Sequence, residues 1–206
     1  MPVGLLHAIR FKDQAFQLRE DAILNAATNT LAAKGFDLMT MDDVAAAVGI
    51  SKPSLYKHFK SKDELVGEAM IRLVDGALAY LAQMPAERPP LERLRALLDW
   101  ALRIRLNGGL PLMPSTSAQV REMLIRNVRY VTRVLKLNGQ LEQVVRDAKA
   151  RGELREDLPD AVILFSYYAR TCDPTVDYLR LYARMDDETI LDHLIGVFFR
   201  GVCRPS

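Results

Sequence analysis

Two short helical patterns on either side of a glycine, within residues 40–64, constrain the fold of this chain more than any other segment. Thr40 is followed three residues later by an acid, a spacing that caps the start of a helix. Gly49 suits the left-handed residue that ends a helix, and Ser51 with Pro53 suits the first turn of the next one. Two short helices joined by a tight turn are typical of a helix-turn-helix, whose second helix enters the DNA major groove.

The remainder of the chain also carries a helical pattern, with apolar residues three and four positions apart. Alternating runs of β-branched and aromatic residues, which are typical of strands, are missing from the sequence. We therefore predict an all-α protein with a partly ordered arm at residues 1–17, where the periodicity is weak. Besides the helix-turn-helix, helices are predicted at residues 19–34, 61–81, 91–106, 118–151 (with a kink at Asn138-Gly139), 161–171 and 186–199.

Positive charge is concentrated on the second helix of the pair. Residues 49–62 hold four lysines and no acid, whereas residues 1–64 as a whole hold eight basic and eight acidic side chains. The whole chain has a net charge of only +2, so nucleic-acid binding has to come from such a local patch. Ser54, Tyr56 and His58 add groups that hydrogen-bond to phosphates or base edges. A solvated helical hairpin, or a protein-interaction module that binds no DNA, is the alternative that this pattern leaves open.

Several function classes find no support in the sequence. The histidines are not placed in an acid–nucleophile pattern and no glycine-rich phosphate loop is present, so we predict no enzyme. Cys172 and Cys203 fit no metal-ligand spacing and are interpreted as reduced thiols, with a redox switch as the alternative. We predict neither a metal nor a cofactor. No apolar run is long enough to span a membrane and no secretory signal is recognisable, which predicts a cytoplasmic protein.

Three segments in the first third of the chain follow a known family pattern: Ala33–Phe36, Thr40–Lys52 and Leu55–Leu65. Through them, residues 19–66 resemble the N-terminal domain of the TetR family of bacterial transcription regulators. The resemblance implies a homodimer that binds double-stranded DNA at a palindromic operator and leaves it when a small-molecule effector binds. It implies a repressor, with an activator or a ligand-independent regulator of the same fold as the alternative.

The resemblance also implies a division of the chain and a set of DNA contacts. About nine helices are expected, with the arm and the helix-turn-helix DNA-binding domain in residues 1–64 and a helical ligand-binding and dimerisation domain in residues 65–206. Thr40, Tyr56 and Lys62 look like the phosphate contacts, whereas the base-reading region contains Lys52, Pro53, Ser54 and Lys57. Many members have glycine in place of Pro53, so we expect an apolar contact there, such as one to a thymine methyl group.

The C-terminal part resembles the family in layout rather than in motif. Its last two apolar helices are expected to form the dimer interface, with the candidates Val162, Phe165, Tyr168, Leu194, Phe198 and Phe199. The candidates for a ligand pocket are Trp100, Ile104, Met113, Met123, Tyr130, Tyr167 and Tyr168. Core packing within one chain is the alternative for both sets. A basic stripe of Arg126, Arg129, Arg133 and Lys136 is interpreted as the solvated face of a helix, with an anion site as the alternative.

Overall fold

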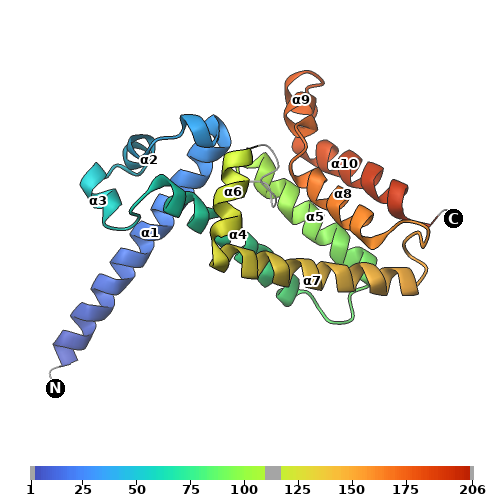
Figure 1. Cartoon of the computed structure of the whole chain (residues 1–206), viewed down its shortest axis with the longest axis horizontal. Helices are drawn as coiled ribbons and strands as arrows, with labels where there is room; N and C mark the ends of the chain where they lie inside the picture. The colour runs from blue at the N-terminus through green and yellow to red at the C-terminus, as the bar shows by residue number, and fades with distance from the viewer. Residues whose placement is uncertain (1–2, 110–116, 205–206) are drawn as a thin grey trace. The chain divides into compact units, whose positions relative to one another are not determined.

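The computed structural model of the chain describes residues 3–109 and 117–204. In this part of the chain there are ten α-helices and no strand, apart from an isolated bridge between Leu154 and Cys203 (Figure 1). The prediction of an all-α protein is confirmed. The helices are α1 (Val3–Leu38), α2 (Met41–Val48), α3 (Lys52–Tyr56), α4 (Lys62–Gln83), α5 (Pro90–Leu106), α6 (Ala118–Arg126), α7 (Val128–Ala150), α8 (Asp160–Thr171), α9 (Thr175–Leu181) and α10 (Asp187–Val202).

The chain divides into two compact units. The first unit extends to Ala69 and the second begins at Met70, so α4 starts in one unit and ends in the other. Each unit buries apolar side chains of its own. Within the described residues, none of the helices combines the length and the apolar content that a membrane span requires.

The N-terminal unit consists of α1, α2, α3 and the first turns of α4. Each of these helices contributes buried apolar side chains, among them Ile23, Val44, Leu55 and Leu65. Helix α1 bends at Gly35, whose φ of 73° lies in the left-handed region that glycine adopts without a steric penalty. The residue after the bend, Phe36, is buried.

The start of α1 differs from its prediction. Residues 3–17, which fall in the partly ordered arm expected at residues 1–17, belong to α1, which begins at Val3 and is helical up to the bend at Gly35. Alanine and leucine are common in this stretch and no proline interrupts it. Such residues favour a helix even where no amphipathic pattern is visible. In Figure 1, the N-terminal end of α1 extends beyond α2 and α3.

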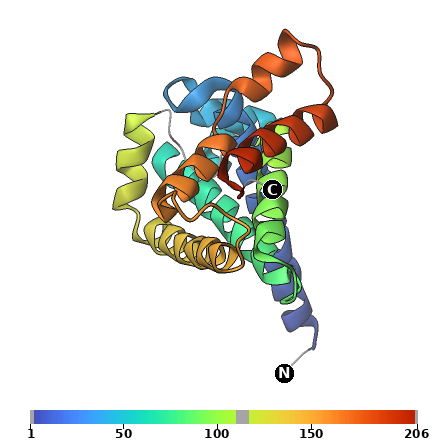
Figure 2. The same ribbon diagram turned by 90° about the vertical axis from the view of Figure 1, so that its right-hand side faces the viewer.

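The C-terminal unit is built around α5, which contacts α7, α8 and α10. Leu97, Leu98 and Leu102 of α5 are completely buried. Helices α8 and α10 lie next to each other in both views (Figures 1 and 2). Gly76 of α4 allows a close approach of α5, because a Cβ atom at this position would meet the Trp100 ring at 3.3 Å.

The single long helix predicted at residues 118–151 is also wrong. The helix is interrupted at Asn127, whose side-chain oxygen accepts a hydrogen bond from the Tyr130 backbone N–H and caps α7. Asparagine favours such a position because its side chain competes for backbone N–H groups. Asn138 and Gly139, where a kink is predicted, both lie within α7, and neither has a positive φ. In the basic stripe, Arg133 pairs with Asp75 of α4 at 2.8 Å, and the other three members are exposed.

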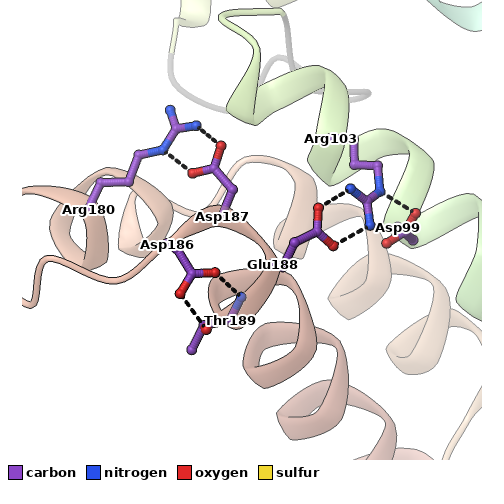
Figure 3. Close-up of polar contacts among 7 residues, drawn as sticks. All are labelled: Asp99, Arg103, Arg180, Asp186, Asp187, Glu188 and Thr189. Atoms are coloured by element: carbon purple, nitrogen blue, oxygen red, sulfur yellow. Dashed lines mark hydrogen bonds and ion pairs between the residues drawn. The ribbon is translucent and has the colours of Figure 1, made fainter.

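Helix α9 was not predicted, and ion pairs fix it to its neighbours. Asp177 of α9 pairs with Arg105 of α5, and Arg180 of α9 pairs with Asp187 of α10. Figure 3 shows the second of these pairs beside Asp186, whose side chain accepts from the Thr189 backbone N–H and caps α10. In the same view, an α5 arginine, Arg103, bridges Asp99 of α5 and Glu188 of α10.

Candidate nucleic-acid interface and ligand cavity

The helix-turn-helix is held by the caps that the sequence predicts. The Thr40 backbone N–H donates to Asp43 Oδ2 at 2.9 Å, and the Asp43 backbone N–H donates to Thr40 Oγ1 at 3.1 Å. Helix α2 ends at Gly49, which has a left-handed φ of 76°. The Ser51 side chain caps α3 by accepting from the Ser54 backbone N–H. These bonds satisfy backbone groups at the helix ends, and the predicted caps are confirmed.

Helix α3 has an apolar side and an opposite side that carries charge. Leu55 is completely buried, and Phe59 just beyond the helix is buried as well. The opposite side carries Lys52, Pro53, Tyr56 and Lys57, which are all exposed and which we term the α3 face. Tyr56 leaves 42% of its surface open to solvent even though it is a large aromatic residue. Burial of Leu55 therefore fixes which side chains α3 presents outward.

Two acids of α2 pair with lysines, one on the α3 face and one in α1. Asp42 Oδ2 lies 2.8 Å from Lys52 Nζ, and this hydrogen bond raises the pKa of Lys52. Asp43 lies 2.7 Å from Lys34 Nζ, and the bonds from Lys34 and Thr40 lower the pKa of Asp43 to about 2. Among the described residues, Lys57 has no ion-pair partner. The positive charge of the α3 face is thus partly balanced at Lys52 and unbalanced at Lys57.

Besides Thr40 and Lys52, three more predicted DNA contacts have partners inside the N-terminal unit. Ser54 is half-buried and its hydroxyl accepts from the Ser51 hydroxyl at 3.0 Å. The His58 ring stacks on Phe16 of α1 with 4.2 Å between the ring centroids, and burial lowers the pKa of His58. Lys62 Nζ donates to the Phe36 carbonyl at 2.9 Å and lies over the Phe36 ring. Thr40 and the α3 face are open to solvent, and all of the predicted contacts with DNA, theirs included, stay predictions.

A small cavity lies in the C-terminal unit between α4, α7 and α8. Its volume is about 50 Å³, and its lining residues are Val74, Tyr130, Val134, Leu137, Asn138, Phe165 and Tyr168. The predicted pocket residues Tyr130 and Tyr168 are among them. Asn138 was not predicted as a lining residue. The signal that could have indicated it is its polar side chain within the apolar pattern of α7, which continues to the buried Leu141.

The other predicted pocket residues lie elsewhere. Trp100 stacks on Tyr80, and Tyr167 is buried with its hydroxyl donating to the Leu94 carbonyl at 3.0 Å. Ile104 packs next to Gly109, and Met123 is half-buried in α6. Met113 lies outside the described residues. Trp100 and Tyr167 thus contribute to packing between helices of this unit.

The predicted dimer residues fall into two groups. Val162 and Phe165 of α8 are exposed large apolar side chains, and Val197 of α10, which was not predicted, is another. The other predicted residues are buried within the chain itself, namely Tyr168, Leu194, Phe198 and Phe199. Helices α8 and α10 therefore each keep apolar side chains at the surface and use the rest in the core.

Comparison with known proteins identifies the family. Residues 23–69 match the sequence profile described as "Bacterial regulatory proteins, tetR family". The chain is 31% identical over 141 residues to nucleoid occlusion factor SlmA of Vibrio vulnificus (strain YJ016), an alignment covering 65% of this chain and 69% of that protein. The chain belongs to the TetR family. It is therefore a DNA-binding transcription regulator and not an enzyme.

Two further TetR-related comparisons agree with this assignment. The chain is 35% identical over 80 residues to the HTH-type transcriptional repressor KstR2 of Mycolicibacterium smegmatis, covering 38% of this chain and 39% of that protein. A TetR-family regulator from Agrobacterium tumefaciens has the same fold, with a TM-score of 0.69 and 19% identity over 91% of this chain and 99% of that one. TetR regulators bind DNA and small-molecule effectors, typically as dimers.

The ion pair between Asp42 and Lys52 gives a prediction specific to this TetR chain. Asp42→Asn removes a negative charge beside the α3 face and frees Lys52 for phosphate. We expect DNA affinity to rise by about twofold to fivefold, the range of an exposed ion pair. Fluorescence anisotropy with a labelled duplex measures it. The control is Asp37→Asn, which makes the same charge change at an exposed acid outside the pair. An equal rise in both variants would show that only net charge matters.

Proposed function

We propose that this TetR chain is a dimeric repressor that leaves a palindromic operator when a small molecule occupies the cavity between α4, α7 and α8. The observation that carries the proposal is the α3 face, an exposed lysine- and tyrosine-bearing surface held in place by the buried Leu55. A dimer places two such helices in successive major grooves, roughly 34–36 Å apart. A bacterial regulator of this kind acts in the cytoplasm, where its DNA lies.

The α3 face suggests how the groove is read. Tyr56 and Lys57 supply a hydroxyl and a cation, which suit phosphate oxygens or guanine edges. Pro53 is exposed on the same face and has no N–H to donate, so its contact with a base is apolar. A thymine methyl group is the partner that fits.

Helix α4 supports the link between ligand and DNA. The helix begins at Lys62, whose ammonium group is bonded to the end of α1, and it carries Val74 in the lining of the cavity. In the proposal, α4 has one arrangement in the DNA-binding protein and another in the released protein. A ligand shifts the equilibrium between them only if it binds the two with different affinity. Exposed Val162, Phe165 and Val197 on α8 and α10 provide apolar surface for the dimer contact.

A DNA-binding titration tests the proposal. The protein is mixed with a labelled duplex from the region upstream of its own gene, and a scrambled duplex serves as the control. We expect a dimer-sized complex that binds the upstream duplex at least about a thousandfold more tightly, as is usual for specific regulators. Metabolites that raise the melting temperature are then added, and a true effector lowers operator affinity.

Three outcomes would contradict parts of the proposal. Equal affinity for both duplexes would contradict sequence-specific binding. A monomer on DNA at all concentrations would contradict the dimer. Ligands that stabilise the protein but never change operator affinity would contradict release by an effector. A reporter gene distinguishes the sign of regulation, because expression that falls on deletion of the regulator identifies an activator.

A further inference from the structure

The cavity between α4, α7 and α8 has a lining without charge. Every described side chain that lines it is apolar, aromatic or an amide, and the apolar part comes from Val74, Val134 and Leu137. The two tyrosines stay uncharged as well, because burial raises the pKa of Tyr130 to about 12 and also raises the pKa of Tyr168. A charged ligand in this cavity would lose its hydration without gaining a counter-charge.

The polar groups of the cavity form one small cluster. Tyr168 Oη donates to Asn138 Oδ1 at 2.6 Å, which leaves the Asn138 amide N–H groups and an oxygen lone pair of Tyr168 available. Among the described residues, the Tyr130 hydroxyl has no hydrogen-bond partner, although Tyr130 is only 8% exposed. These groups can donate to, or accept from, one hydroxyl or carbonyl oxygen.

The size of the cavity limits what fits. About 50 Å³ exceeds the space that one water needs, but it is below the roughly 150 Å³ of an engineered cavity that holds benzene. Phe165 of α8 also lines the cavity and is 57% exposed. A short apolar group with one polar atom matches the enclosed part.

We propose that this cavity binds a neutral, mainly apolar small molecule whose single hydroxyl or carbonyl oxygen bonds to Asn138 and Tyr168. The proposal rests on the proposed function for its effect on DNA, but the binding itself does not depend on DNA. Neutrality follows from the uncharged lining, and the single oxygen follows from the one polar cluster.

Three four-carbon probes test the ligand class: butanol, butyrate and butylammonium. Binding is followed by the methyl signals of Val74, Val134 and Leu137 in NMR spectra of the full chain. We expect saturable shifts with butanol at about millimolar Kd, in keeping with so small a ligand. Binding of the two ions is expected to be weaker by about tenfold or more, because each carries an unpaired charge into the cavity.

Matched variants locate the site. Val134→Phe fills the cavity and abolishes the butanol shifts of Val74 and Leu137, whereas Val128→Phe makes the same change at an exposed position of the same helix and leaves them intact. Val134→Leu is a smaller change, which is expected to weaken butanol binding. It serves as the test if the Val134→Phe protein does not fold. Asn138→Asp puts a negative charge in the lining and reverses the preference toward butylammonium.

The outcomes separate this inference from the proposed function. Equal response to all three probes, or unchanged butanol shifts in the folded Val134 variants, would overturn the ligand class while leaving DNA binding unaffected. Specific binding of butanol by a protein that binds no upstream DNA would overturn the proposed function alone. Discrimination for butanol that disappears with the Val134 variants supports the inference.

Discussion

Replacing Tyr56 and Lys57 together by alanine is expected to lower operator affinity by roughly a hundredfold. Both side chains are exposed on the α3 face, and Lys57 has no ion-pair partner among the described residues. Their loss removes a cation and a hydroxyl from the α3 face but leaves the buried apolar side of α3 unchanged. The salt dependence of binding should also become shallower by about one phosphate contact. A titration of labelled operator at several salt concentrations measures both effects.

A matched double variant serves as the control for that experiment. Tyr178 and Lys136 are also exposed, but they lie on α9 and α7 of the C-terminal unit. Tyr178→Ala with Lys136→Ala therefore makes the same change in composition and charge away from α3. We expect wild-type affinity from this protein. If it bound DNA as weakly as the α3 variant, net charge rather than the α3 face would govern binding.

The local features of the helix-turn-helix could be predicted because short-range chemistry determines them. Thr40 and Asp43 are three residues apart, and their reciprocal hydrogen bonds require only the start of a helix. Glycine adopts a left-handed backbone conformation more readily than other residues, and Gly49 has this conformation at the end of α2. The exposed side of α3 follows in the same way, once Leu55 is assigned to the core.

Contacts between residues far apart in the sequence could not be predicted from short-range patterns. The stacking of His58 on Phe16 and the bond from Lys62 to the Phe36 carbonyl depend on where α1 lies, which no spacing in residues 40–64 reveals. Asn127 was also missed, because the same residue type suits a helix surface or a cap and only the surrounding packing decides.

The cavity shows the same limit for the ligand site. Tyr130 and Tyr168 were predicted among seven candidates, but Trp100 and Tyr167 lie in helix packing instead. All four have similar aromatic character in the sequence. Their separation into lining and core comes from the crossing of α4, α5, α7 and α8, which is a property of tertiary packing.

Leu55→Ala is expected to lower the free energy of unfolding of the N-terminal unit by about 2–5 kcal/mol, because the completely buried side chain leaves a cavity in the core. Small units have little stability to lose, so DNA binding should fall as well. Urea unfolding followed by circular dichroism measures the change. Leu38→Ala is the control, since Leu38 is 73% exposed and its loss should change stability by at most about 0.5 kcal/mol. Equal destabilisation by both variants would contradict the assignment of Leu55 as the residue that orients the α3 face.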